Sequence, residues 1–242
     1  MPRLARKYLE SPFLHIIIQG IDKSYIFQEN SLKNAYKSIL KKNIESLNVE
    51  VIAYCIMDNH VHLLLYGENT DEVTKIMHRT NTSYARLYNK VNQRVGYVFR
   101  DRYYVQMILS EKQLYNCIAY IHKNPLHAGI VKDLKDYKYS SYAEYIDKRD
   151  FITNTSVKLV FGNSSNYLDL FNEIHRINDI EDIKDIVEEP KNPKTIINDY
   201  LKDKSKSLDE IKLDKKLLGE LLIKLRFDAR IIFERYGNSS KY

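Results

Sequence analysis

This sequence of 242 residues lacks any long apolar run. No segment approaches the roughly 20 apolar residues that a membrane-spanning helix needs. The first seven residues carry two arginines and a lysine and lack the apolar core of a signal peptide. Internal repeats and low-complexity segments are also absent. We therefore expect a cytoplasmic protein that does not insert into a membrane.

Cysteine is scarce as well. The only two, Cys55 and Cys117, each lie inside an apolar segment, and their spacing is not that of a set of metal ligands. A disulfide and a zinc site are therefore both less favoured than two small buried hydrophobic residues.

The composition is typical of a globular protein, with 44% hydrophobic and 29% charged residues. The length suits one large domain or a domain with an appendage. The net charge of +6 is unevenly placed, because residues 1–148 hold 21 Lys and Arg against 15 Asp and Glu, whereas residues 149–242 hold 17 of each. The first part could therefore meet a polyanion, although charge alone does not separate nucleic acid from a solvated basic face.

Hydrophobic periodicity predicts a sheet with three helices in the first 125 residues. The helix before Pro125 should end near Asn124, because a proline disfavours helical geometry at the preceding residue. Strand, helix, strand, strand, helix, strand is the split βαβ order of ferredoxin-like α+β folds, which places two helices on one face of a four-stranded antiparallel sheet. The third helix would then cover the other face. The expected strands are 13–19, 49–57, 60–66 and 103–109, and the expected helices are 30–44, 70–91 and 110–124.

Two histidines alternate with apolar residues at the start of the third expected strand. Side chains two apart in a strand share a face, so His60 and His62 would emerge together and form half of a metal site. The alternative is a pair of ordinary half-buried strand histidines. If the third helix crosses that face, Tyr120 and Asn124, which are four residues apart, could both point towards the pair.

Basic residues concentrate in the second helix and the segment after it. Between Lys75 and Arg102 there are seven basic residues and one acid, Asp101, with Tyr84 and Tyr88 beside the basic helix face. Basic groups interleaved with aromatic rings suit phosphate contact and base stacking on single-stranded nucleic acid, whereas the alternative is a solvated helix face. The predicted DNA contacts are Lys75, Arg79, Arg86, Lys90, Arg100, Arg102 and Lys123.

The C-terminal part reads as helical. A helix is expected at 167–174, an acidic stretch at 178–189, a linker at 190–193 and further helices over 211–227 and 228–236. We divide the chain into a catalytic domain (1–148), a helical extension (149–190) and a C-terminal helical segment (191–242). That last segment could be part of a helix-turn-helix or a docking or dimerising element.

Several motifs taken together resemble a known family. They are Pro2-Arg3, His15 in the first strand, Met57-Asp58-Asn59-His60-Val61-His62-Leu63-Leu64, the run Tyr120-Ile121-His122-Lys123-Asn124-Pro125 with its continuation to Val131, and Lys138-Tyr139-Ser140-Ser141-Tyr142. Over roughly residues 1 to 145 the chain is similar to the single-tyrosine (HUH, Y1) transposases of the IS200-like group, and most similar to their REP-associated branch. It departs from many relatives by having Gln19 in place of Arg and Asp58 in place of Pro.

The resemblance implies a role for each matching residue. His60 and His62 match the family's metal-binding pair, Tyr120 its nucleophile, and Asn124 its third metal ligand. Mg²⁺ or Mn²⁺ would be the cofactor, no nucleotide cofactor would be needed, and single-stranded or hairpin DNA would be the partner. His15 is expected to be a packed strand histidine, with a place in the site as the alternative.

The expected function is therefore metal-dependent nicking and joining of single-stranded DNA through a 5′-phosphotyrosine intermediate, which conserves phosphoester energy for rejoining. Two other readings stay open. One is a DNA-binding, domesticated transposase that acts as a repressor with little catalysis. The other is a metal-dependent hydrolase that attacks with water. Whether the chain forms a homodimer, and whether Tyr120 acts within its own subunit, is also open.

Overall fold

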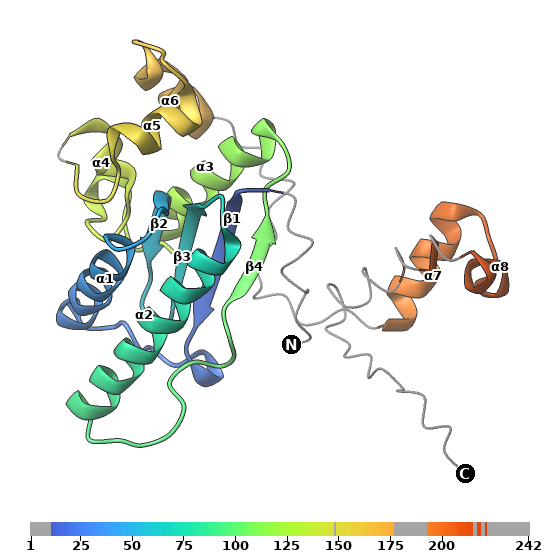
Figure 1. Cartoon of the computed structure of the whole chain (residues 1–242), viewed down its shortest axis with the longest axis horizontal. Coiled ribbons are helices and arrows are strands. Elements are labelled where there is room, and N and C mark those ends of the chain that lie inside the picture. Colours follow the sequence, from blue (N-terminus) through green and yellow to red (C-terminus); the bar gives the residue numbers. More distant parts are fainter. Residues whose placement is uncertain (1–10, 148, 177–192, 215–216, 219–220, 222–242) are drawn as a thin grey trace. The chain divides into compact units, whose positions relative to one another are not determined.

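The computed structural model describes residues 11–147, 149–176, 193–214, 217–218 and 221. The first part contains β1 (Phe13–Gln19), α1 (Asn30–Ile44), β2 (Glu50–Ile56), β3 (His60–Tyr66), α2 (Thr70–Val91), β4 (Tyr104–Met107) and α3 (Glu111–His127) (Figure 1). This order is the one that the hydrophobic periodicity predicts. The bounds of β1, β3 and α2 agree with the prediction, whereas β2 and β4 are shorter than expected.

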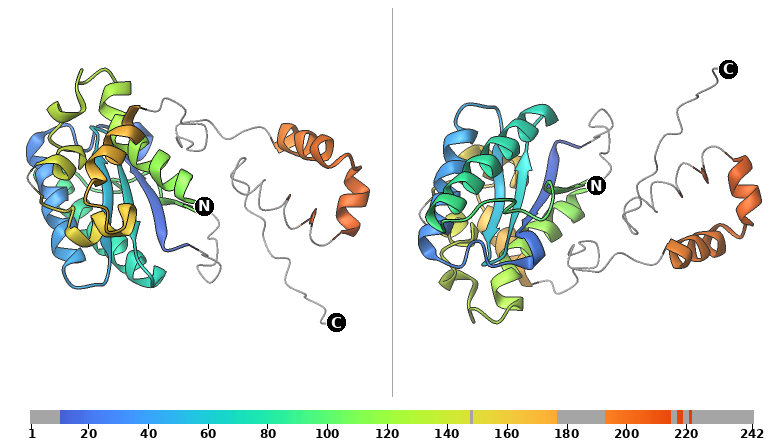
Figure 2. Two further views of the ribbon diagram at one scale, coloured as in Figure 1. Left: turned by 90° about the horizontal axis from the view of Figure 1, so that it is seen from above. Right: turned by 90° about the horizontal axis from the view of Figure 1, so that it is seen from below.

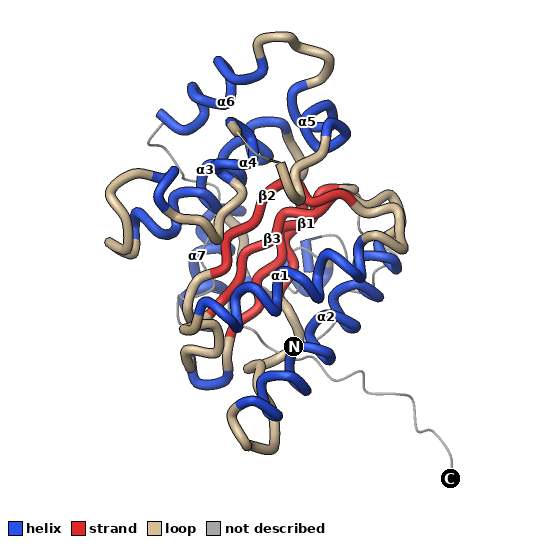
Figure 3. Tube along the Cα trace, turned by 90° about the vertical axis from the view of Figure 1, so that its left-hand side faces the viewer, coloured by secondary structure: helices blue, strands red, loops and turns tan. Residues whose placement is uncertain are grey.

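The four strands form one antiparallel sheet in the order β2-β3-β1-β4, so the predicted ferredoxin-like topology is confirmed. The central strands are β1 and β3. Helices α1 and α2 cover one face of the sheet, and α3 lies on the other (Figures 2 and 3). Because Ile17 pairs with His62 and Gln19 with His60, alternate residues of β1 share the histidine face with alternate residues of β3.

Aromatic packing joins α1, α2 and the segment between β1 and α1. The rings of Phe27, Tyr36 and Tyr84 lie 4.9 to 5.2 Å apart, and the Tyr84 hydroxyl donates to the Ile26 carbonyl at 2.5 Å. Tyr84 is fully buried. The prediction that Tyr84 lies beside the basic helix face is therefore wrong, because the buried stripe of α2 continues from Thr80 one turn further to this residue.

The expected end of α3 is also wrong. The helix passes Pro125 and ends at His127, three residues beyond the predicted end at Asn124. It is closed by Gly129 at φ +67°, with the Gly129 N–H bonded to the Leu126 carbonyl and the Ile130 N–H to the Pro125 carbonyl. This is a Schellman ending, and the proline is tolerated because it costs only one hydrogen bond in the last turn.

Three short helices follow α3 in the same unit, namely α4 (Tyr142–Ile146), α5 (Asn154–Phe161) and α6 (Tyr167–Arg176). The helix predicted at 167–174 is thus confirmed. Cys55 and Cys117 are buried free thiols, as the sequence predicts. Among the described helices, none is long and apolar enough to cross a membrane.

A second compact unit contains α7 (Pro193–Lys204) and α8 (Leu208–Leu213). Tyr200, Ile211 and Leu221 form its small core. The sequence does not predict α7. The helix predicted over 211–227 is wrong in both bounds, because α8 begins at Leu208 and ends at Leu213, before Asp214 with its extended backbone. The acidic stretch at 178–189, most of the linker at 190–193 and the final helix at 228–236 lie outside the described residues.

Candidate active site

A tight turn at Asp58 and Asn59 presents the histidine pair. The carbonyl of Asn59 accepts from the Gly20 N–H at 2.9 Å, and the carbonyl of Asp58 accepts from the Phe27 N–H at 2.8 Å. The Asp58 carboxylate also forms an ion pair of 2.5 Å with the ammonium group of the buried Lys33. The loop that follows β1 and the first turn of α1 therefore fix the point at which β3 begins.

His60 and His62 project from the same face of β3, and their ring centroids are 4.8 Å apart. The Nδ1 atom of His60 lies 2.6 Å from the side-chain oxygen of Asn59. The Nδ1 atom of His62 lies 3.1 Å from Nε2 of His15, which reaches it from β1. Since Nδ1 is engaged in both rings, Nε2 is the nitrogen through which each ring could bind a metal.

Helix α3 places Tyr120 over these rings. The Tyr120 ring is nearly perpendicular to His62 with a centroid distance of 5.5 Å and to His15 with a distance of 6.1 Å. Its side chain is 7% exposed. Strands β1 and β3 and helix α3 thus bring His15, His60, His62 and Tyr120 together, although Tyr120 is 58 residues from His62 in the sequence.

Asn124 lies one turn after Tyr120 on the same helix and is buried. Its side-chain nitrogen donates to the Tyr120 carbonyl at 2.9 Å. The amide oxygen is therefore the atom that could bind a metal. The hydrogen bond orients Asn124 on its own helix, and the described contacts do not join it directly to the histidines.

Burial favours the neutral imidazoles of His15 and His62. It lowers the pKa of His15 to about 4, although the side chain of Gln106 acts in the opposite direction. Burial also holds the pKa of His62 well below its usual value, with smaller contributions from His60 and His15. Neutral imidazole is the form that binds metals, so this donor set fits a divalent cation with two ring nitrogens and an amide oxygen. Over the described residues, no group of three His, Cys, Asp or Glu side chains could hold a metal ion, so a third donor beside the two histidines would have to be the amide oxygen of Asn124.

The predicted DNA contacts fall into three places. Lys75, Arg79, Arg86 and Lys90 are exposed on α2, but that helix covers the sheet face opposite to the histidines. Arg100 and Arg102 are exposed near the site, and the Arg100 N–H bonds to the carbonyl of Gln19, the residue paired with His60. Lys123 is only 6% exposed, and burial lowers its pKa.

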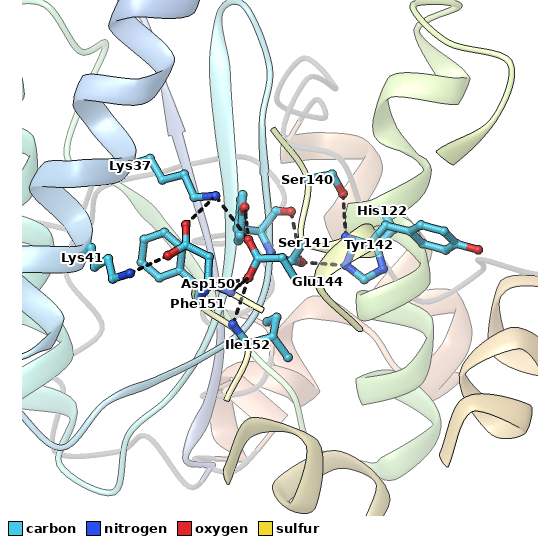
Figure 4. Close-up of polar contacts among 11 residues, drawn as sticks. Lys37, Lys41, His122, Ser140, Ser141, Tyr142, Glu144, Asp150, Phe151 and Ile152 are labelled. Carbon is cyan, nitrogen blue, oxygen red and sulfur yellow. Dashed lines mark hydrogen bonds and ion pairs between the residues drawn. The ribbon is translucent and has the colours of Figure 1, made fainter. Parts of the chain in front are cut away.

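Two features of the site region escape the sequence reading. One is the contact between His15 and His62, which depends on the register of β1 against β3; the sequence predicts a place for His15 in the site only as the alternative to a packed strand histidine. The other is a buried hydrogen-bonded group behind Tyr120, in which His122 Nε2 lies 2.8 Å from Ser141 Oγ (Figure 4). The alternation of His15 with apolar residues could have indicated the first, whereas nothing local indicates the second.

The sequence of this chain is similar to those of known proteins. Residues 10–124 match the model of the family "Transposase IS200 like". A protein of Haemophilus influenzae named as a REP-associated tyrosine transposase is 31% identical over 140 residues, which cover 54% of this chain and 78% of the relative.

Two solved structures are also similar. One is a REP-associated tyrosine transposase bound to a REP hairpin, with 15% identity, coverage of 61% of this chain and 87% of the other, and a TM-score of 0.48. The second is a transposase from Deinococcus radiodurans R1, with 18% identity, coverage of 47% and 91%, and a TM-score of 0.35.

The split βαβ sheet, the histidine pair and the tyrosine helix, together with the family match, define a transposase of the IS200-like type. The Haemophilus relative is 31% identical, and the match covers 78% of its length, so the chain can be assigned to a narrower family. The chain belongs to the family of REP-associated tyrosine transposases.

Proposed function

We propose that this protein nicks and rejoins single-stranded DNA at a hairpin, with Tyr120 as the nucleophile and a divalent cation held by His60, His62 and Asn124. The observation that carries the proposal is the position of the Tyr120 ring, 5.5 Å from His62 and nearly perpendicular to it. A hydroxyl on this ring and a phosphate bound at the histidine pair would therefore lie close together.

A tyrosine hydroxyl has an ordinary pKa of about 10 and attacks a phosphodiester poorly at neutral pH. When bound, Mg²⁺ or Mn²⁺ would neutralise charge on the phosphate oxygens and orient the phosphate. The chain supplies the rest. His60 and His62 are held through Nδ1, Asn124 is held by the Tyr120 carbonyl, and the walls of the site exclude water from around the tyrosine ring.

In the proposed step, the Tyr120 oxygen forms a bond to phosphorus and the bond from phosphorus to the 3′ oxygen breaks. The phenol loses its proton and the departing 3′ oxygen gains one. The products are a 5′-phosphotyrosine and a 3′ hydroxyl. Attack of another 3′ hydroxyl reverses these bond changes and joins the strands, so the step needs no ATP.

The test is a denaturing gel of the full chain incubated with Mn²⁺ and labelled hairpin DNA with single-stranded flanks, including a REP hairpin. Wild type should give a slowly migrating covalent adduct that requires metal, and Tyr120→Phe should give none. Tyr115→Phe is a matched control, because Tyr115 lies on the same helix but donates to Glu111 and stacks on Phe161.

Other outcomes would overturn the proposal. Cleavage without an adduct in both wild type and Tyr120→Phe would indicate hydrolysis by water. Tight hairpin binding without cleavage in any metal would indicate a repressor.

A further inference from the structure

Three side chains on the histidine face lie in a row across the strands β4, β1 and β3. Gln106 of β4 is the direct cross-strand partner of His15 in β1. His15 in turn lies against His62 of β3, with the two rings nearly parallel at a centroid distance of 5.3 Å. Both histidine side chains are fully buried. The row therefore ends at one of the two residues that match the family's metal ligands.

The 3.1 Å contact between His15 Nε2 and His62 Nδ1 requires that one nitrogen carries the hydrogen. If His15 donated, a neutral His62 would carry its own hydrogen on Nε2, and that nitrogen could not bind a metal. If His62 donates from Nδ1, its Nε2 presents a lone pair. His15 then accepts at Nε2 and carries its hydrogen on Nδ1.

Gln106 selects the second arrangement. The Nδ1 atom of His15 and the side-chain oxygen of Gln106 are both buried, and in the described part of the chain neither makes a hydrogen bond of good geometry with any other group. The two residues are direct cross-strand neighbours on the same face of the sheet, so the Gln106 side-chain oxygen is placed to accept from His15 Nδ1. An acceptor at Nδ1 favours a hydrogen there, and therefore a lone pair on Nε2.

We propose that His15 is a positioning residue, which together with Gln106 holds His62 in the tautomer and ring orientation that present Nε2 to a divalent cation. This inference rests on the proposed function, because it concerns the metal that the reaction would use. Partners of this kind typically change metal affinity by 10- to 100-fold when they are removed.

The first experiment measures Mn²⁺ affinity of the full chain by calorimetry. His15→Leu removes the acceptor and should weaken binding by about 10- to 100-fold. His15→Gln keeps a side-chain oxygen that can accept from His62 Nδ1, and should recover most of the affinity. Ile16→Ala is the matched control, because Ile16 adjoins His15 in β1 and is equally buried but lies on the opposite face of the sheet from the histidines. It should lower the melting temperature without a comparable loss of affinity.

The second experiment reads the tautomer directly. Nitrogen-15 NMR of the metal-free protein should show the hydrogen of His62 on Nδ1 in wild type and a shift of that population in His15→Leu. A hydrogen on Nε2 in wild type, or a His15→Leu variant that binds Mn²⁺ as tightly as wild type, would overturn the role of His15. A wild type that binds no Mn²⁺ would instead overturn the proposed metal chemistry itself, and the NMR result would still report on the hydrogen bond.

Discussion

The Nδ1 atom of His122 lies 2.9 Å from Nε2 of His175, and the hydrogen bonds around this pair can run in only one direction. His175 Nδ1 must donate to the Phe171 carbonyl, 2.6 Å away, so its Nε2 accepts from His122. His122 Nε2 then accepts from the hydroxyl of Ser141. Two neutral rings thus connect α3, two residues after Tyr120, to α6 and to the segment before α4.

Acid should weaken this connection. Burial lowers the pKa of His175 to about 4 and holds that of His122 well below its usual value, whereas both would titrate near 6.5 in the unfolded chain. As pH falls through 6.5 towards 4, these two histidines bind protons in the unfolded chain but stay neutral in the folded chain. Stability is therefore complete above pH 6.5 and lost on acidification, by about 3 kcal/mol at most for His175.

Urea unfolding at pH 7.5 and pH 5 measures this loss. His175→Gln keeps an acceptor for His122 but cannot titrate, so it should show a smaller loss between the two pH values than wild type. His78→Gln changes an exposed histidine and should match wild type. An unchanged pH dependence in His175→Gln would contradict the assignment.

Replacing Glu144 with glutamine should destabilise the protein strongly. The buried Glu144 carboxylate accepts from three consecutive backbone N–H groups, those of residues 150–152, and from the Tyr54 hydroxyl, and it pairs with Lys37. The amide NH2 group of glutamine would face one of these donors and leave it without an acceptor, at a cost of about 3 kcal/mol in the free energy of unfolding. The urea midpoint measures this effect. Asp147→Asn, which changes an exposed carboxylate three residues later, should leave the midpoint within error.

The ion pair between Asp58 and Lys33 should couple the turn before β3 to α1. The Lys33 side chain is 6% exposed and that of Asp58 is 40% exposed. A double-mutant cycle with Asp58→Asn and Lys33→Met should therefore give a coupling of only about 1 kcal/mol. The exposed pair Asp209 and Lys212 provides a comparison cycle, in which the coupling should be close to zero. Equal coupling in both cycles would mean that the turn is fixed by its backbone bonds alone.

Replacing Arg100 should weaken the binding of short single-stranded DNA, whereas replacing Arg79 should not. The backbone N–H of Arg100 bonds to Gln19, the residue that pairs with His60, whereas Arg79 lies on α2, across the sheet from the histidines. With a short single-stranded oligonucleotide, Arg100→Gln should weaken binding and reduce the slope of log K against log salt by about 1. Arg79→Gln should change neither quantity. Fluorescence anisotropy over a salt series measures both, and a larger effect of Arg79 would place the DNA on the helical face.

The sequence predicts the sheet well because its strands are short, β-branched and separated by clear turn signals. The alternation in β3 predicts the shared face of His60 and His62, and the structure places them so. Pro125 does not end α3 as the sequence predicts, because the helix continues to His127 and Gly129 closes it. The burial of Tyr84 follows the helical spacing from Thr80, a signal that the basic residues around it obscure, and its ring packs against Tyr36 of α1.

The rest of the candidate site depends on contacts between distant segments. His15 meets His62 only because of the strand register, and His175 meets His122 only because α6 packs on α3. Side chains that touch across 47 or 53 residues leave no periodic signal in the sequence. Such contacts arise only from the packing of the strands and helices against one another.

The alternation along β3 also limits how this gene can vary. Val61 and Leu63 fill the core under α1 and α2, while His60 and His62 face Tyr120 from the other side. Inserting or deleting one codon within the strand would exchange the two sets, placing imidazoles in the core and aliphatic groups in the site. Changes in length should therefore be tolerated in surface loops, and selected against between residues 60 and 66.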